Sequence, residues 1–444
     1  MCKKAQKYNR CRNGLMLWKE LFYFEAITMT YFLFAIYLLL FCWLITRVRF
    51  LKNSGLSNQW LIGLFVLKVM AGMAYGFFYQ QTHNYQVASD TWRFFYDAKV
   101  ETQLLLKNPL RYFGNFLDNP HDKQYRHLFS PVNSYWKDLK ELYMVKLVSV
   151  FNLLSGSRYY VNVIFFSFIT FFGPVAFLKI MNDVFPGRIR ILAIGTFLLP
   201  SFLFWSSGIH KDGFVFMLLV LAAYYFYFGW KEQKLNWKRY ALIAFIVLLI
   251  FPVRNHVVLA AIPGFAAWWL AEKFFTQKWI SYALVTVIGI TIFFTSKYVH
   301  PKLDLPISIV LRQKDFKKLG GNSILPQRPL KATFPSFVAN APQALNHTLA
   351  RPYLTEIESP FYLLSALELA LLWLIIFIWF FRFTDNPYKH SVVLFFFMIS
   401  MALLLLTGYI VPQLGAIVRY RSIFLPLLMV PILATSKWNN DILK

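Results

Sequence analysis

The chain has 444 residues, of which 58% are hydrophobic, 20% aromatic and 15% charged. This composition excludes a single soluble globule and a disordered chain, and it predicts an all-α, polytopic membrane protein. The formal net charge is +26, but the basic residues are scattered between apolar runs. We therefore expect membrane lipids and phosphate as partners, and no nucleic acid. The only cysteines are Cys2, Cys11 and Cys42, so no disulfide can join the later loops.

Apolar runs long enough to cross a bilayer recur along the chain. A crossing needs about 20 apolar residues, and one transmembrane domain over 29–436 with about eleven helices, within a range of ten to twelve, is predicted on this basis. The runs lie near 29–46, 60–80, 159–180, 190–206, 213–229, 240–253, 256–271, 279–297, 361–381, 391–409 and 421–436. An amphipathic stretch at 142–154 is interfacial or re-entrant, and the interfacial interpretation is favoured.

The connections between these runs differ in charge. Lys and Arg are concentrated in connections that share one side if every run crosses, namely 47–52, 188–190, 231–239, 273–278, 382–389 and the tail 437–444. The positive-inside rule makes that side cytoplasmic. Two long loops, 81–141 and 298–360, then lie outside, together with the turn at His210, the corner at Arg254 and the segment 412–421.

The first 28 residues break this pattern. They carry six Lys and Arg residues, yet the topology above puts them outside. Either the reading frame is over-long, with a start at Met16 or Met29, or the segment is a basic helix on the cytoplasmic surface and the number of crossings is even. Both interpretations stay open. No cleavable signal peptide is expected, because the first apolar run is too long and lacks a small-residue cleavage site.

The first long loop carries two acidic residues at helical spacing. Asp90 and Asp97 are seven residues apart, so on a helix they share one face, with Arg93 between them. An acidic residue just after an early external crossing resembles the GT-C glycosyltransferases, which take sugars from polyprenyl-phosphate carriers. The resemblance implies a base or metal ligand here, and Asp90 matches best, Asp97 second. The alternative is a loop helix with a solvated acidic face.

A turn between two apolar runs places His210, Lys211 and Asp212 side by side at the rim of the bilayer. Charged groups cost about 2.5–3.5 kcal/mol each at the centre of a membrane and less at its edge. The turn resembles a hairpin of bacterial polysaccharide-assembly membrane proteins. If the next helix begins near Asp212, Lys211 and the free backbone N–H groups can hold a phosphate. Alternatively, Asp212 only caps the helix and Lys211 only extends to the interface.

Two further corners carry basic side chains. Arg254 and His256 interrupt the apolar run 242–270, which is too long for one crossing. They indicate an anion or proton-transfer site, or they only hydrate a hairpin. Arg419 and Arg421 flank a tyrosine before the last run and look like the approach to a late helix in membrane glycosyltransferase relatives. Guanidinium groups can hold phosphate bidentately, either from a substrate or from a lipid anchor.

The second long loop is strongly basic and can enclose a pyrophosphate or a charged glycan, or it can serve as a solvated cap. Its end, with Arg351 before a proline, resembles a segment of uncharacterised bacterial polysaccharide-cluster proteins. Glu368, about two turns into the next crossing, should face protein and pair with Arg351, Arg254 or Arg419. Lys68 is expected to extend to the inner surface of the membrane.

These features predict a GT-C-type glycosyltransferase of the bacterial inner (plasma) membrane, acting on its external face. Asp90 or Asp97 would deprotonate the acceptor, and the donor would be a sugar linked to a polyprenyl phosphate such as undecaprenyl phosphate. The acceptor would be a glycan, lipid or protein. The residues expected to bind substrate or phosphate are Arg93, His210, Lys211, Asp212, Arg254, His256, Arg351, Glu368, Arg419 and Arg421.

The chain departs from the GT-C pattern in one respect, and other functions stay open. The acidic loop follows the second crossing, whereas in the GT-C family it follows the first. No cofactor is certain, and a divalent metal remains an option that no ligand pattern supports. Two other functions stay open: a polysaccharide polymerase that uses external arginines and histidine without an aspartate base, and a lipid or glycan transporter with Lys68 and Glu368 facing one continuous path.

Overall fold

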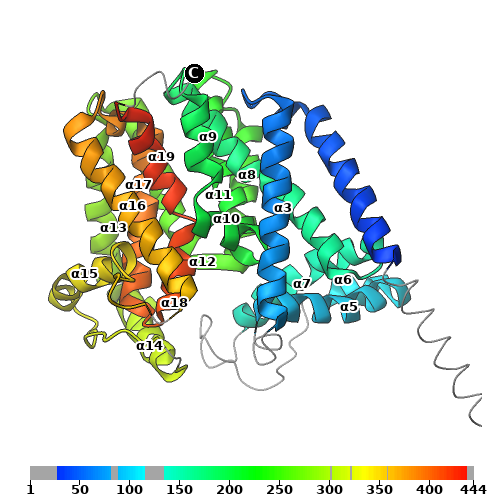
Figure 1. Ribbon diagram of the computed structural model, residues 1–444. Coiled ribbons are helices and arrows are strands. Elements are labelled where there is room, and N and C mark those ends of the chain that lie inside the picture. Colours follow the sequence, from blue (N-terminus) through cyan, green and yellow to red (C-terminus); the bar gives the residue numbers. More distant parts are fainter. Residues whose placement is uncertain are drawn as a thin grey trace, which may run out of the picture.

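The computed structural model describes residues 28–81, 89–115, 135–300, 303–320, 323–357 and 359–437 (Figure 1). Within these ranges the chain is helical, with two isolated β-bridges and no strands. The predicted all-α, polytopic membrane fold is confirmed. The basic N-terminal segment up to residue 27 and the tail from residue 438, for which the sequence makes separate predictions, lie outside the described residues.

The structure describes helices of very different lengths. In chain order they are Thr28–Arg47, α2 (Arg49–Lys52), α3 (Asn58–Gln81), α5 (Asp90–Lys107), α6 (Pro109–Gly114), α7 (Tyr135–Ser155), α8 (Tyr159–Val184), α9 (Ile189–Phe197), α10 (Pro200–Ser207), α11 (Lys211–Lys231), α12 (Trp237–Phe274), α13 (Lys278–Val299), α14 (Leu305–Lys318), α15 (Phe334–Leu349), α16 (Pro360–Arg382), η2 (Pro387–Lys389), α17 (Ser391–Ile410), α18 (Leu414–Ser422) and α19 (Leu425–Thr435).

Eight of the described helices are long and apolar enough to cross a membrane. Two bent pairs bring the number to ten if each pair is one crossing: α9 with α10, bent by 59°, and α18 with α19, bent by 56°. The amphipathic stretch 142–154 lies within α7, which is not among these candidate spans.

Helix α12 consists of two arms that meet at Arg254, whose φ of −148° and ψ of 80° are not helical. A straight helix of its 38 residues would be about 57 Å long, far beyond a hydrocarbon core of about 30 Å. The first arm runs back along α11, because it starts near the end of α11 and Arg254 reaches Asp212 at the start of α11. The second arm returns, since Trp268 contacts Phe226 near the far end of α11 at 4.8 Å.

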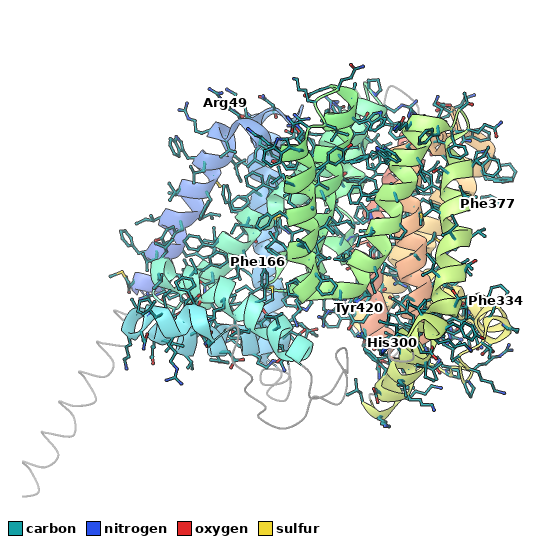
Figure 2. All side chains as sticks on the ribbon, turned by 180° about the vertical axis from the view of Figure 1, so that it is seen from behind. Arg49, Phe166, His300, Phe334, Phe377 and Tyr420 are labelled. Atoms are coloured by element: carbon teal, nitrogen blue, oxygen red, sulfur yellow. The ribbon has the colours of Figure 1, made fainter. Side chains whose placement is uncertain are left out.

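The break in α12 therefore gives two crossings, as predicted from the runs 240–253 and 256–271. With α12 counted twice, the described part of the chain has eleven candidate crossings. The ring of Tyr420 lies 4.8 Å from the Arg254 guanidinium, and Figure 2 shows Tyr420 near the end of the bundle where the two arms meet. A chain that turns here exposes polar backbone at the end of the bundle rather than in its apolar middle.

The two ends of the bundle have different characters. At one end, called here the basic face, connections rich in Lys and Arg meet: Arg188 donates to Ser436 O at 2.9 Å, and Lys437 N donates to Arg382 O at 2.8 Å. For the connections 188–190 and 382–389 and for Lys437, the prediction of a shared side is confirmed; the rest of the tail lies outside the described residues. The opposite end, called here the site face, carries α5, α6 and α7 under one half of the bundle and α14 and α15 under the other (Figure 1).

Aromatic packing holds the middle of the bundle together. Trp268 of α12 is buried against Phe226 of α11 and Phe395 of α17, with ring centroids 4.8 and 5.1 Å apart. Because lipid tails are as apolar as the side chains, close packing rather than removal of water stabilises such contacts in a membrane. The rigid centre fixes the ends of α11 and α12 relative to each other, and the polar residues discussed next lie at those ends.

Candidate functional site

Polar side chains from four separate elements meet on the site face. They are Asp90 at the start of α5, His210 and Asp212 at the start of α11, Arg254 at the break in α12 and Arg419 on α18. These five residues are called the acid–base cluster below. His210 is the N-cap of α11, and its Nδ1 accepts a hydrogen bond from Asp212 N at 3.3 Å. Helix starts and breaks can hold such groups because their backbone N–H groups need acceptors.

Asp212 is the fully buried hub of the cluster. Its Oδ1 pairs with Arg254 Nη2, and its Oδ2 accepts a hydrogen bond from Arg419 Nε at 3.0 Å. The same Oδ2 lies 2.8 Å from His210 Nδ1. Two guanidinium groups and one imidazole therefore surround a single carboxylate, which satisfies a charge that would otherwise be very costly to bury.

Asp90 forms the open end of the cluster. Its Oδ2 accepts a hydrogen bond from Arg419 Nη2 at 2.9 Å and lies 3.3 Å from His210 Nε2. The imidazole of His210 thus lies between the two carboxylates. The Asp90 side chain is 25% exposed, whereas those of His210 and Asp212 are fully buried. Asp90 is consequently the carboxylate of the cluster that a substrate can reach.

The charge of Asp90 is strongly stabilised. Burial alone would raise the pKa of Asp90, but the hydrogen bond with His210 and the charges of Arg419 and Lys211 outweigh it and hold the pKa well below 3.8. Asp90 is therefore ionised, and its charge is balanced by its neighbours.

Lys211 lies beside the cluster without an acidic partner. Its side chain is buried, and its Nζ sits 4.8 Å from the centre of the Phe94 ring. Among the residues that the structure describes, its ammonium makes no hydrogen bond and no ion pair. A buried cation that lacks an acceptor is unfavourable, so this position favours an anionic ligand at the N-terminal end of α11.

Aromatic rings line the cationic side of the site. Tyr420 lies between the two arginines, 4.8 Å from the Arg254 guanidinium and 5.6 Å from that of Arg419. Trp205 lies 5.8 Å from Arg419 on another side. Ring faces attract guanidinium groups and limit their rotamers. The Nε of Arg254 is buried and has no partner within the described residues.

Arg93 extends the site towards α7, in which no site residue is predicted from the sequence. Its Nη2 lies 3.5 Å from Asp90 Oδ1 and 3.0 Å from Glu141 Oε1. Glu141 is thus a site residue that sequence reasoning missed. A signal was present, since Glu141 directly precedes the amphipathic stretch 142–154, for which the sequence predicts an interfacial or re-entrant helix but no site residue.

Asp97, the second predicted base, does not join the cluster. It is exposed on α5, and its seven-residue separation from Asp90 corresponds to about 10 Å along the helix. Burial by its neighbours raises the pKa of Asp97, the nearby Glu141 adds to this effect, and Arg93 opposes it. The two aspartates on one helix face therefore have opposite electrostatic environments.

Replacing each aspartate by asparagine should change the acid stability in opposite directions. The folded pKa of Asp90 is depressed, so its contribution to stability is present above about 3.9 and disappears as the pH falls towards the folded pKa. The folded pKa of Asp97 is raised, so its contribution is present at low pH and disappears as the pH rises. We expect the unfolding free energy of Asp90→Asn to fall less than that of the unchanged protein on acidification.

Asp97→Asn should lose slightly more stability than the unchanged protein over the same acidification. Thermal unfolding in nanodiscs between pH 7 and pH 3 measures both effects. Equal pH profiles for the two variants would contradict this assignment of their environments.

Arg421 lies away from the cluster, so the predicted phosphate contact of Arg421 is wrong. Its side chain is completely buried and donates to Thr348 O, Arg351 O and Ser365 Oγ, the last at 2.6 Å. Residues two positions apart on a helix lie about 200° apart around its axis. Because α18 presents Arg419 to the site, it must present Arg421 to α15 and α16.

The remaining predicted residues have other environments. Arg351 Nη1 pairs with Glu356 Oε1 at 2.9 Å in the connection that precedes α16. Glu368 accepts a hydrogen bond from Ser201 N at 3.0 Å, and not from one of the three arginines that the sequence suggested. His256 is half-buried on the second arm of α12. Lys68 does not extend to the membrane surface, because it is buried and its Nζ donates to Ser206 O at 2.8 Å.

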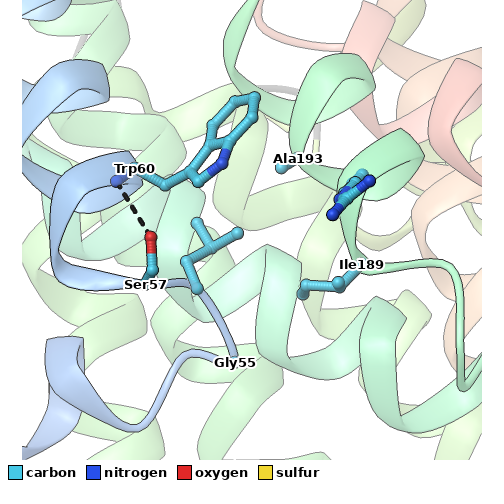
Figure 3. A pocket seen from close by; sticks show the side chains of 7 residues that line it. Gly55, Ser57, Trp60, Ile189 and Ala193 are labelled. Carbon is cyan, nitrogen blue, oxygen red and sulfur yellow. Dashed lines mark hydrogen bonds between the residues drawn. The ribbon is translucent and has the colours of Figure 1, made fainter. Parts of the chain in front are cut away.

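A separate cavity of about 230 Å³ opens on the basic face, between the start of α3 and the start of α9 (Figure 3). Its lining offers the Ser57 hydroxyl, the Trp60 indole and the Arg190 guanidinium, but no carboxylate or imidazole. The Ser57 hydroxyl accepts a hydrogen bond from Trp60 N at 3.3 Å. This cavity lacks the acid–base groups that distinguish the site face.

The site face therefore combines an ionised carboxylate, an imidazole, two guanidinium groups and an unpaired ammonium. Such a set can bind a phosphate and move a proton. Within the described ranges, no group of three His, Cys, Asp or Glu side chains is arranged to hold a metal ion. No family model, curated protein or solved structure matches this chain.

Proposed function

We propose that this protein is a membrane glycosyltransferase that moves a sugar from a polyprenyl-phosphate carrier to a glycan, lipid or protein acceptor. The reaction would take place at the site face, on the outer side of the bacterial plasma membrane. The observation that carries the proposal is the meeting of Asp90, His210 and Asp212 with Arg254 and Arg419, next to the unpaired ammonium of Lys211.

The cationic groups are suited to the carrier phosphate. In the proposed reaction the acceptor oxygen bonds to the anomeric carbon of the sugar, while the bond from that carbon to the phosphate oxygen breaks. The phosphate leaves with the electron pair and gains negative charge. Lys211 and the guanidinium of Arg419 lie where they can stabilise this charge, and water-poor surroundings strengthen such interactions.

Asp90 would accept the proton of the acceptor hydroxyl. With these neighbours alone Asp90 is a weak base, because His210 and Arg419 stabilise its ionised form. A phosphate that binds Arg419 competes with Asp90 for the same guanidinium. Binding of the donor then raises the basicity of Asp90 at the moment when a base is needed. His210, held by Asp212 at 2.8 Å, orients Asp90 and stabilises the charges that develop.

A polysaccharide polymerase is the second candidate, and the depressed pKa of Asp90 favours it. In that reaction the arginines and His210 would act on a pyrophosphate-linked repeat, and Asp90 would only hold Arg419 in place. The transporter alternative has less support. Lys68 and Glu368, which it would require on one open path, are both hydrogen-bonded to the backbone of α10.

Carrier binding tests the proposal without knowledge of the sugar. The protein is incorporated into nanodiscs, and its melting temperature is measured with undecaprenyl phosphate and with undecaprenol, which has the same chain but no phosphate. A ligand at 100 times its Kd stabilises the folded state by about 2.7 kcal/mol, so we expect a clear rise with undecaprenyl phosphate alone. An equal rise with undecaprenol, or no rise with either lipid, would contradict a phosphate site.

A further inference from the structure

Helix α10 is a short half-helix whose two ends each meet a buried charged side chain. At its start, Glu368 Oε1 of α16 accepts a hydrogen bond from Ser201 N at 3.0 Å. At its end, Lys68 Nζ of α3 donates to Ser206 O at 2.8 Å and lies 3.3 Å from Ser206 Oγ. Both charged side chains are more than nine-tenths buried.

The signs of these charges match the ends of the helix. The first N–H groups of a helix have no intrahelical acceptor and carry a partial positive charge, while the last carbonyls carry a partial negative charge. Pro200, the first residue of α10, has no N–H, so Ser201 supplies the first free donor. The carboxylate of Glu368 at the start of α10 and the ammonium of Lys68 at its end are therefore each attracted by the partial charge of the helix end that they contact.

Charged groups inside a membrane bundle are costly unless they are paired. Lys68 has its described hydrogen bonds with Ser206 and Ser207, and Glu368 has its described hydrogen bond with Ser201. The partners of both residues are therefore on α10. A bend of 59° separates α10 from α9, so the half-helix needs contacts of its own to hold its direction.

The end of α10 leads directly into the acid–base cluster. Ser207 is followed by Gly208 and then by His210. Helix α3 lies alongside this turn (Figure 1), and Gly72 of α3 sits so close that a Cβ there would come within 2.6 Å of Ser207 O. The Tyr75 ring lies against Gly208 and is 6.1 Å from the ring of His210. A shift of α10 would therefore move His210.

We propose that Lys68 and Glu368 are positioning residues, which hold α10 between α3 and α16 and thereby fix the turn that carries His210 and Asp212. Neither residue contacts the acid–base cluster directly. The inference rests on the geometry of α10 and does not depend on the reaction proposed above.

Hydrogen exchange measured by mass spectrometry in nanodiscs tests this inference. In Lys68→Met and in Glu368→Leu we expect the amides of residues 201–213 to exchange about tenfold faster, and a tenfold change corresponds to about 1.4 kcal/mol of local opening. Exchange in α8 and α17 should not change. Lys68→Arg, which keeps the charge and the donors, should restore the protection.

A matched control and a milder variant complete the experiment. Lys179→Met removes another half-buried lysine that bonds to a backbone carbonyl, Phe50 O at 3.3 Å, and it should leave residues 201–213 unchanged. Glu368→Gln keeps the acceptor and loses the charge, so about threefold faster exchange is expected from the helix-end interaction. Unchanged exchange in a folded Lys68→Met or Glu368→Gln variant, or an equal increase in Lys179→Met, would overturn the inference.

A second readout separates positioning from general support of the fold. The Kd for undecaprenyl phosphate should rise about tenfold in Lys68→Met, which corresponds to about 1.4 kcal/mol. It should return to its original value in Lys68→Arg. This change is expected although Lys68 lies outside the proposed phosphate site. If the unchanged protein does not bind this lipid, the proposed function fails. The exchange of residues 201–213 decides the role of Lys68 and Glu368 in either case.

Discussion

Replacing Lys211 by methionine is expected to weaken the binding of undecaprenyl phosphate about 10- to 100-fold and to change the stability of the protein little. The side chain of Lys211 is buried, its Nζ lies 4.8 Å from the centre of the Phe94 ring, and among the described residues it makes no ion pair. Its removal costs the longer-range attraction to Asp90 and Glu141, but it also removes the cost of burying an ammonium, so we expect only a small change in stability. The phosphate, in contrast, loses a charge-assisted contact worth about 1.5–3 kcal/mol, a factor of 10 to 100 in Kd.

The matched control is Lys231→Met at the other end of the same helix. Lys231 is exposed, pairs with Asp183 at 2.7 Å and lies on the basic face. This variant removes the same charge from α11 but should not change the Kd. Binding is measured by titration of nanodiscs with the lipid, and stability by thermal unfolding. Strong destabilisation by Lys211→Met would mean that the ammonium holds the fold, and an equal loss of binding in both variants would mean that net charge alone attracts the lipid.

Most of the bundle could be predicted from the sequence, because its physical causes are local. The length of each apolar run determines whether it can cross a bilayer, and the alternation of crossings then assigns each corner to a face. Even numbers of crossings separate His210, Arg254 and Arg419 along the chain, so the three residues must lie at the same end of the bundle. Their contact with Asp212 depends in addition on which helices are neighbours, and run lengths contain no information about that.

The sequence-based predictions failed where the direction of a side chain depends on which helices pack against its own helix. Arg419 and Arg421 look equivalent in the sequence, but only one side of α18 can face the site, and burial against α15 and α16 decides which. Asp90 and Asp97 share a helix face, but the cluster lies at the start of α5, out of reach of Asp97.

The environments of Lys68 and Glu368 differ from the prediction for another reason, because the sequence predicts that Lys68 reaches the membrane surface and that Glu368 pairs with an arginine. Both bind backbone atoms at the ends of α10, and those atoms become available only because the crossing from α9 is bent. A pattern of side chains along the sequence does not reveal a backbone N–H or carbonyl that lacks a partner. The bend itself gives little warning, since Pro200 is the only residue there that disfavours a continuous helix.

The two carboxylates on either side of His210 are expected to respond to substitution in opposite ways. Asp212 is completely buried between Arg254 and Arg419. Asp212→Ala leaves both guanidinium groups without this acceptor and should lower the unfolding free energy by about 3–5 kcal/mol. Asp90 is partly exposed and Asp90→Asn keeps an acceptor for Arg419, so this variant should cost clearly less stability than Asp212→Ala.

The effect on glycan transfer should not follow the effect on stability, because Asp90→Asn costs little stability but removes the proposed base. As the proposed base, Asp90 contributes a factor of about 10²–10⁴ to the rate, so Asp90→Asn should abolish transfer in a protein that still folds and still binds undecaprenyl phosphate. Asp97→Asn, with the same change two turns along α5, is the control and should keep full activity. Thermal unfolding, lipid titration and glycan assembly in cells measure the three properties separately.

Retained glycan assembly in Asp90→Asn would remove the base from the proposed mechanism. Combined with loss of assembly in Arg254→Ala, it would favour the polymerase, in which Asp90 only holds Arg419 by their 2.9 Å hydrogen bond. The asparagine keeps an acceptor for that bond but cannot take a proton at neutral pH. The Asp90→Asn variant therefore separates the holding of Arg419 from the acceptance of the proton, the two roles that the geometry alone assigns to the same carboxylate.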